Sequence, residues 1–213
     1  MKGEHDLERL RRFYRDHHEH GDRQDFTVSE DRRGPLFAAW IGRGRRVLDL
    51  GCRDGTLTRY FAEGNQVLGL DVDRDALGQA ATRLGIETRW ADVSLSVPAD
   101  DAAFDCVVAG EVIEHLPYLD VVLDEIARVL TPGGLFVGSV PNAYNLKARI
   151  NVLKGEELDR DPTHLQFFSP AKLRRVLEPR FDLRELVAVR GKWAWLSLAL
   201  FARHLAWRAV KHA

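Results

Sequence analysis

Residues 47–57, which read VLDLGCRDGTL, combine a short apolar run with a turn that contains two glycines. The apolar run predicts a buried strand, and Gly51 and Gly55 suit a tight turn whose backbone a ligand can approach closely. We expect a helix to follow, with unpaired N–H groups at its start. Asp71 lies twenty residues after Gly51, at the end of the next apolar run. A carboxylate there could accept hydrogen bonds from the hydroxyls of a ribose, so the stretch predicts a ribose-containing ligand.

Outward from this stretch, short apolar runs alternate with helical patterns, which is typical of a parallel sheet wound with crossover helices. Glycine and proline residues, Gly85 and the TPGG sequence of residues 131–134, are expected to end the first two helices. The predicted fold class is therefore α/β, a doubly wound, mostly parallel, seven-stranded, Rossmann-like sheet with helices on both faces. The predicted strands are 47–50, 67–71, 86–90, 104–109, 135–140, 183–189 and 205–210. The predicted helices are 77–84, 122–129 and 169–178.

The length of 213 residues and the composition, with 45% hydrophobic and 30% charged residues, fit one globular α/β domain. Residues 1–33 are rich in charge and histidine, and we expect them to form an N-terminal helical lid over a ligand-binding domain of residues 34–213. The net charge of −1 gives no overall attraction to nucleic acid. The sequence begins without an apolar leader and has no apolar run of membrane-spanning length, so we expect a cytoplasmic protein without a transmembrane segment.

The third and fourth predicted strands also end in small or acidic residues. Asp92 and Val93 follow the third strand and would suit an adenine amino group and ring, and Gly110 and Glu111 follow the fourth. Because the carboxyl ends of parallel strands meet at one edge of a sheet, these residues should open onto the same crevice as the glycine-bearing turn.

Over residues 36–190, these motifs resemble those of class I S-adenosylmethionine-dependent methyltransferases. The resemblance implies S-adenosylmethionine as the cofactor, with the two glycines near its methionine part, Asp71 on its ribose, and Asp92 and Val93 at its adenine. Family members usually carry a third glycine where Arg53 stands, which predicts weaker cofactor binding. A nicotinamide-binding domain is the alternative, but its G-x-G-x-x-G spacing does not match. The implied cofactor-binding residues are Asp49, Gly51, Cys52, Arg53, Gly55, Asp71, Val72, Asp92, Val93 and Glu111.

The sequence EVIEH at residues 111–115 follows the fourth strand, and we expect Glu111, Glu114 and His115 to share one face of a helical turn. Together with VPN at 140–142 and THLQFF at 163–168, this set resembles ubiquinone-type O-methyltransferases, methyltransferases of surface-polysaccharide and sugar pathways, and small-RNA 2′-O-methyltransferases. In the last group, and by some resemblance the first, matching residues hold a divalent ion. The implied metal ligands are Glu111, Glu114, His115 and His164, with Mg²⁺, Mn²⁺ or Zn²⁺ as the ion.

The same pattern has an interpretation without a metal, in which the two histidines line the acceptor pocket and one acts as a general base. Glu111 would then touch the cofactor, and Glu114 would have a structural role. In either interpretation, the candidate catalytic residues are His115, Glu114 and His164.

These features predict methyl transfer to a hydroxyl of a small molecule, such as a sugar, a glycan precursor or a quinone-like phenol. RNA 2′-O-methylation is the alternative, disfavoured because the chain lacks an added basic domain. A cofactor-binding module that supports a partner enzyme is a third possibility. The aromatic stretch 191–201 is expected to pack in the core behind the last strands, with an apolar substrate, a membrane surface or a homodimer contact as alternatives. The polar and basic residues Asn145, Lys147, Arg149 and Lys154 are expected to solvate a helix, with contact to hydroxyls or a phosphate of the acceptor as the alternative.

Overall fold

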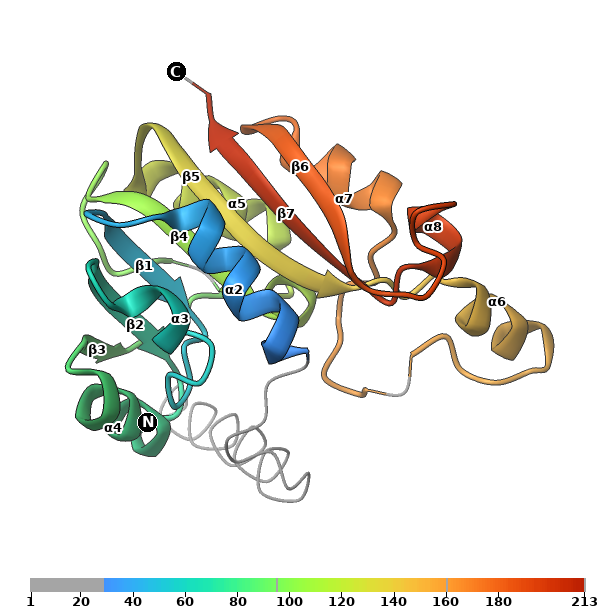
Figure 1. Cartoon of the computed structure of the whole chain (residues 1–213), viewed down its shortest axis with the longest axis horizontal. Helices are drawn as coiled ribbons and strands as arrows, with labels where there is room; N and C mark the ends of the chain where they lie inside the picture. The colour runs from blue at the N-terminus through green and yellow to red at the C-terminus, as the bar shows by residue number, and fades with distance from the viewer. Residues whose placement is uncertain (1–28, 95, 160, 213) are drawn as a thin grey trace.

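The computed structural model describes residues 29–94, 96–159 and 161–212 (Figure 1). One sheet contains seven strands in the order β3-β2-β1-β4-β5-β7-β6, and β7 runs in the opposite direction to the other six. All seven predicted strands are confirmed, as is the mostly parallel, doubly wound fold class. The strands are β1 (Arg46–Leu50), β2 (Gln66–Asp71), β3 (Glu87–Trp90), β4 (Phe104–Gly110), β5 (Leu130–Pro141), β6 (Phe181–Arg190) and β7 (His204–Lys211).

The TPGG sequence of residues 131–134 lies within β5, and the preceding helix already ends at Val129. Phe104 pairs with Leu130 and Cys106 with Leu135, so these residues form a register shift between β4 and β5. The helix therefore ends just before TPGG, as predicted. The sequence did not predict that TPGG itself would form a bulge in β5.

Local capping explains where two of the predicted helices begin and end. The Asp73 side chain accepts hydrogen bonds from the N–H groups of Asp75 and Ala76, and the helix that follows ends at Gly85, whose φ is 64°. Ser169 caps the other helix in the same way, with Pro170 in its first turn. The helices are α2 (Glu30–Ile41), α3 (Arg59–Ala62), α4 (Arg74–Leu84), α5 (Leu119–Val129), α6 (Leu146–Leu153), α7 (Pro170–Leu177) and α8 (Leu198–Phe201), with a 3₁₀ helix η1 (Ile113–His115).

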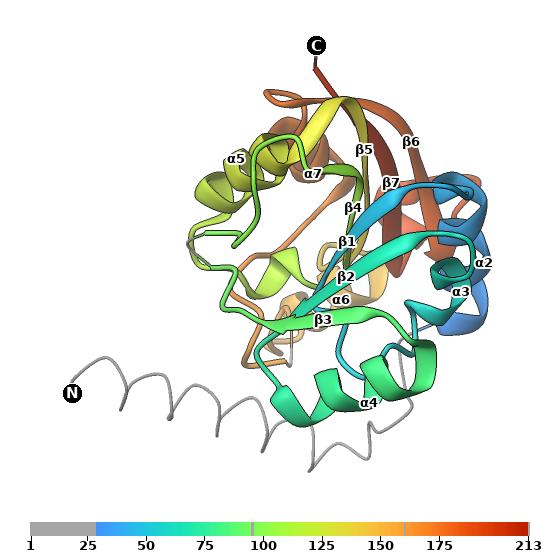
Figure 2. The same ribbon diagram turned by 90° about the vertical axis from the view of Figure 1, so that its left-hand side faces the viewer.

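Helices cover both faces of the sheet, as predicted (Figures 1 and 2). One face packs against α2 and α3 through Phe37, Trp40 and Phe61. The other packs against α5 and α7 through a larger apolar cluster that includes Leu123 and Trp207. Because the helices bury the two faces, the ends of the strands are where polar side chains can gather, and the carboxyl ends of β1 to β5 share one edge with the start of β7.

The predicted boundary between a lid of residues 1–33 and a domain of residues 34–213 falls inside α2. The Arg33 side chain is 1% exposed and donates a hydrogen bond to the Ser139 hydroxyl on β5, so it belongs to the interior of the domain. Residues 1–28 of the predicted lid lie outside the described residues. Among the residues that are described, no helix is both long and apolar enough to cross a bilayer.

The stretch between β6 and β7 packs against the core only in part, through residues such as Leu198, whereas its two tryptophans are exposed. The side chains of Trp193 and Trp195 are 52% and 80% exposed, and α8 that follows them has only four residues. The prediction of core packing is therefore wrong for these two tryptophans, because a short loop and a one-turn helix project them away from the sheet.

Candidate functional site

The turn after β1 contains three left-handed residues, with φ of 69° at Gly51, 49° at Arg53 and 81° at Gly55. Arg53 thus adopts the conformation that a glycine would favour, although a Cβ in this region costs about 1–2 kcal/mol. The N–H groups of Gly51 and Cys52 both donate to the Leu70 carbonyl of β2, at 2.8 and 3.2 Å. The replacement of a glycine by Arg53 therefore leaves the glycine-type turn in place.

The two glycines are required by the packing of this chain. A Cβ at Gly51 would lie 2.6 Å from a methyl group of Val112, and a Cβ at Gly55 would lie 2.6 Å from a methyl group of Leu84. Side chains of this chain thus occupy the space beside both glycines, and the approach of a ligand to their backbone stays a prediction.

Two expectations for the turn change. The helix after it, α3, begins only at Arg59, and the N–H groups of Arg59–Ala62 all donate to carbonyls of the preceding residues, so the start of this helix does not offer unpaired N–H groups. The Cys52 side chain is buried, and its sulfur lies where a Cβ at Gly69 of β2 would be. Only the backbone of Cys52 lies in the turn, so its side chain has a packing role.

Two carboxylates are held beneath and beside the turn. The two oxygens of Asp71 accept the N–H groups of Arg53 and Asp73, each at 2.9 Å, which ties the turn to the end of β2. Asp49 is 3% exposed and accepts the Thr58 hydroxyl at 2.7 Å. Burial raises the pKa of Asp71, and it raises the pKa of Asp49 to about 7. Asp71 lies at the carboxyl edge of the sheet, whereas Asp49 lies inside β1 and binds Thr58, which follows the turn.

The remaining predicted cofactor residues lie on the neighbouring strand ends. The Val72 carbonyl accepts the indole N–H of Trp90 at 2.8 Å, which links β2 to β3. After β3, Asp92 accepts the N–H of Ser94 at 3.0 Å, and Val93 packs against the apolar core. Asp71, Val72, Asp92 and Val93 thus follow adjacent parallel strands at one edge.

Glu111 has a left-handed backbone, with φ of 62°, and its partly buried side chain lies in an ionic network. One oxygen lies 3.1 Å from Arg33 Nη1, and the other accepts from His204 Nδ1 at 3.1 Å. Burial alone would raise the pKa of Glu111, but the hydrogen bond from His204 and the charge of Arg33 outweigh it and lower the pKa. Sequence reasoning missed Arg33, His204 and Ser139, because they come from α2, β7 and β5 and share no local motif with Glu111.

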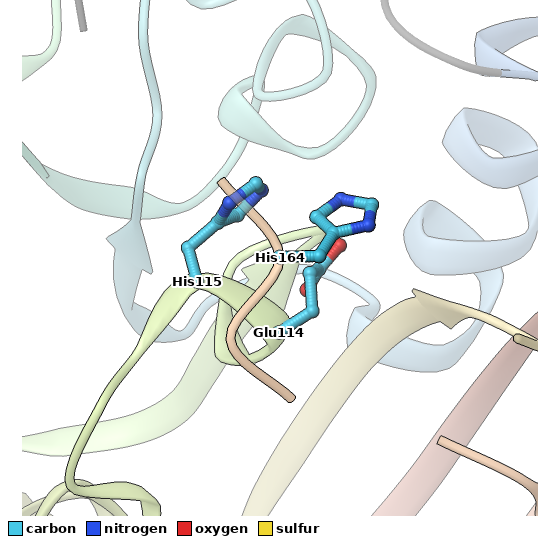
Figure 3. A group of neighbouring side chains, drawn as sticks. All are labelled: Glu114, His115 and His164. Carbon is cyan, nitrogen blue, oxygen red and sulfur yellow. The ribbon is translucent and has the colours of Figure 1, made fainter. Parts of the chain in front are cut away.

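Glu114, His115 and His164 lie together in space, with one potential ligand atom from each within 4.8 Å of the others (Figure 3). The His115 and His164 ring centroids are 4.8 Å apart. The loop that carries His164 is fixed to η1, because the N–H groups of Leu165 and Gln166 both donate to the Glu114 carbonyl at 2.8 Å. The structure thus brings together three of the four predicted metal ligands.

The fourth predicted ligand, Glu111, lies outside this group. The predicted helical face does not form, because η1 begins only at Ile113 and Glu111 precedes it. The left-handed backbone of Glu111 directs its side chain to Arg33 and His204.

Hydrogen bonds define which nitrogen of each histidine faces the group. His115 Nδ1 lies 3.1 Å from the Thr163 carbonyl, which can only accept, and His164 Nδ1 lies 2.7 Å from an Asp159 carboxylate oxygen. In both histidines Nδ1 is therefore the donor, which leaves Nε2 with a lone pair in the neutral ring. Such an oxygen on the opposite nitrogen is the usual second partner of a metal-binding histidine.

The environment of Glu114 is unusual for a carboxylate. The residue is 1% exposed, and neither carboxylate oxygen has a hydrogen-bond partner among the described residues. Burial, followed by the charge of Glu111, raises its pKa well above the usual range. Burial and the proximity of His164 lower the pKa of His115. An unsatisfied buried carboxylate beside two imidazoles is a costly arrangement that a bound cation or proton would relieve.

Comparison with known sequences places this chain in a family. A methyltransferase-domain profile matches residues 22–183. A ubiquinone biosynthesis O-methyltransferase of mouse mitochondria is 31% identical over 193 residues, covering 79% of this chain and 52% of that protein. A probable S-adenosylmethionine-dependent methyltransferase of Mycolicibacterium smegmatis is 32% identical over 149 residues, covering 68% of this chain and 55% of that protein. The chain thus spans about half the length of these relatives.

Solved structures support the fold. A methyltransferase from Methanosarcina mazei described as S-adenosylmethionine-dependent superposes with a TM-score of 0.63 at 21% identity, over 84% of this chain and 97% of that one. A 4+2 cyclase superposes with a TM-score of 0.67 at 22% identity, over 86% of this chain and 82% of that one. The same fold therefore occurs in a protein described by another reaction, and the family assignment rests on the sequence matches. The chain belongs to the methyltransferase-domain family, and its fold is that of class I S-adenosylmethionine-dependent methyltransferases.

Proposed function

We propose that this protein transfers the methyl group of S-adenosylmethionine to a hydroxyl of a small molecule, such as a sugar, a glycan precursor or a quinone-like phenol. The observation that carries the proposal is the Glu114, His115 and His164 group, which lies just beyond the end of β4 on the edge that the turn after β1 shares. Relatives named as ubiquinone biosynthesis O-methyltransferases, in mouse and in Aeromonas salmonicida, support oxygen as the methylated atom.

The donor would bind along the turn after β1 and the ends of β2 and β3. Asp71 would accept the ribose hydroxyls in addition to its backbone contacts, and Asp92 and Val93 would meet the adenine. The Arg33 and Glu111 pair would lie toward the methionine end, because Glu111 directly follows β4 and its N–H donates to β5. Family resemblance and the shared sheet edge support these assignments.

The three clustered side chains fit a divalent cation. Two imidazole nitrogens and a carboxylate form a mixed donor set that suits Mn²⁺ or Zn²⁺, and with added waters also Mg²⁺. The Glu114 oxygens lack a hydrogen-bond partner among the described residues, as expected of oxygens that would bind an ion. Glu114, His115 and His164 would hold it, and when bound it would lower the pKa of a nearby acceptor hydroxyl.

The chain itself would supply proton transfer and positioning. Where no cation is bound, burial lowers the pKa of His115 and favours its neutral ring, so Nε2 could accept the hydroxyl proton. Where Nε2 binds a cation, the pKa of the hydroxyl would instead be lowered, and its proton would leave to solvent. The acceptor oxygen would then form a C–O bond as the S–C bond of the sulfonium breaks, which releases S-adenosylhomocysteine. Holding both reactants at one edge of the sheet supplies most of the rate enhancement.

The test is transfer of a tritiated methyl group from S-adenosylmethionine to simple catechols, to nucleotide sugars and to short RNA, each with EDTA or with added Mn²⁺. We expect label on a catechol or a sugar hydroxyl, with Mn²⁺ restoring activity that EDTA removes. Label on RNA alone would favour the 2′-O-methylation alternative. Binding of S-adenosylhomocysteine without transfer to any hydroxyl acceptor would favour the cofactor-binding module.

A further inference from the structure

One end of the molecule carries exposed apolar side chains from two segments that are far apart in the sequence. Helix α6 and helix α8 lie side by side there (Figure 1). The exposed fractions are large for apolar residues, 87% at Leu153 and 80% at Trp195. We call this surface the α6–α8 face; its exposed apolar residues are Tyr144, Leu146, Ile150, Val152, Leu153, Trp193, Trp195 and Leu196.

The charges on the same two segments have one sign. Residues 141–155 and 186–204 contain no aspartate or glutamate, although the whole chain has 32 acidic and 31 basic residues. Exposed acidic residues resume at Glu156 and Glu157, directly after α6, where the Glu156 N–H donates to the Asn151 carbonyl of that helix. The two segments themselves are therefore basic, although the net charge of the chain is near zero. Their exposed basic residues are Lys147, Arg149, Lys154, Arg190, Lys192 and Arg203.

The face is held in place by polar contacts with the sheet. Asn142, the last residue of the VPN motif at the end of β5, donates its side-chain amide to the carbonyls of Leu198 and Ala202, at 3.2 and 2.9 Å. Trp193 packs edge-on against Phe201, with ring centroids 5.9 Å apart, and Lys192 Nζ lies 5.6 Å from the Trp193 ring centre. The exposed tryptophan and the basic side chains are thus presented together from a fixed base.

We propose that the α6–α8 face binds the surface of a lipid bilayer that contains anionic lipids. Tryptophan and lysine beside exposed leucine and isoleucine form the combination that partitions into the headgroup region, where indoles and aliphatic side chains enter the boundary and cations meet lipid phosphates. Nucleic acid would satisfy the basic residues but would leave aliphatic side chains such as Leu153 uncovered. A second copy that docks with the same face would bring like charges together.

This inference adds a location to the proposed function and rests on it in one respect. The chain leaves α6 and reaches His164 through residues 154–163, so the bilayer contact and the acceptor half of the site are joined by one short loop. Binding to the bilayer would favour an amphiphilic acceptor over a freely soluble one.

The experiment is sedimentation of the full chain with vesicles of phosphatidylcholine, with or without phosphatidylglycerol. We expect binding to the vesicles that contain phosphatidylglycerol, with a blue shift of the tryptophan emission. Partitioning should fall about fivefold for each neutralised basic residue in Lys147→Gln and Lys192→Gln, and it should fall more than fivefold in Trp195→Ala combined with Leu153→Ala. Matched controls on other elements, Tyr118→Ala and Arg174→Gln, should bind like the wild type.

Equal binding by all variants, or no binding of the wild type to anionic vesicles, would overturn the proposal. The proposal would also be overturned if the wild type did not bind vesicles but formed a dimer, seen in sedimentation equilibrium, that Trp195→Ala dissociates. Binding to RNA in place of vesicles would overturn it as well. The S-adenosylhomocysteine affinity of each variant should equal that of the wild type. Failure of lipid binding with intact methyl transfer to a soluble catechol would therefore contradict the membrane inference alone and leave the proposed function standing.

Discussion

The carboxylates in the two halves of the sheet edge, the proposed cofactor side and the proposed acceptor side, differ in their hydrogen bonding. On the cofactor side, Asp49 and Asp71 each accept a hydrogen bond from the chain, and Asp71 accepts two that shape the turn after β1. On the acceptor side, Glu114 is as deeply buried as Asp49, yet both of its oxygens lack a partner among the described residues. The first half is complete before any ligand binds, whereas the second needs a cation or a proton. This difference indicates that donor binding and acceptor activation can be separated experimentally.

The largest expected effect is on the acceptor side. His164→Ala should lower turnover by roughly a hundredfold to ten-thousandfold, the range for the loss of a general base or its equivalent. The affinity for S-adenosylhomocysteine should stay unchanged, because His164 lies outside the turn after β1. Steady-state kinetics and calorimetry on the same protein measure the two quantities. His212→Ala, on an exposed part of the chain near Asp182, is the matched control. A loss of cofactor affinity equal to the loss of turnover would contradict the separation.

Asp49 tests whether burial alone makes a carboxylate costly. Its pKa in the folded protein is about 7, above its value in the unfolded chain, so the folded state binds more protons and the unfolding free energy falls as pH rises toward 7. Asp49→Asn keeps an oxygen for Thr58 and removes the ionisation. The unfolding free energy of the wild type relative to this variant should fall by about 2–3 kcal/mol between pH 5 and pH 8. Urea unfolding across this range measures the difference, and a flat difference would show that Asp49 is not desolvated.

The cofactor side is tested by Asp71→Ala, which should weaken S-adenosylhomocysteine binding by about 1.5–3 kcal/mol, the scale for lost hydrogen bonds to a charged group. Turnover at saturating donor should change much less, because the acceptor cluster is intact. Asp75→Ala, an exposed carboxylate on the adjoining turn of α4, is the control and should bind like the wild type. Unchanged affinity in Asp71→Ala would reject the ribose assignment.

The same asymmetry decides what could be predicted from the sequence. The seven strands and the turn after β1 depend on residues that are close in sequence, so apolar runs and glycine spacing predicted them. The position of Glu111 depends on Arg33 and on His204, which is 93 residues away, and local helical spacing wrongly grouped it with Glu114. Exposure of Trp193 and Trp195 depends on a loop whose direction local periodicity does not encode. Local patterns thus predicted the frame and the cluster of three, but not the ionic network beside it.

The smallest expected effect concerns the departure from the family at Arg53. Arg53→Gly removes the cost of a left-handed Cβ but increases the freedom of the unfolded chain, so the unfolding free energy should rise by no more than about 1 kcal/mol. Arg53→Ala keeps the Cβ and should not gain this stability, which makes it the control in a urea titration. A loss of more than about 1 kcal/mol in Arg53→Gly would mean that the arginine side chain stabilises the turn.

The most direct test of the separation between the two halves is a calorimetric titration of the wild-type protein with S-adenosylhomocysteine in EDTA, followed by Mn²⁺ after the chelator is removed. We predict saturable cofactor binding at one site in EDTA, and a separate heat of Mn²⁺ binding that is lost in Glu114→Gln and His115→Ala. Cofactor binding that requires the metal, or the absence of saturable cofactor binding under both conditions, would contradict the account.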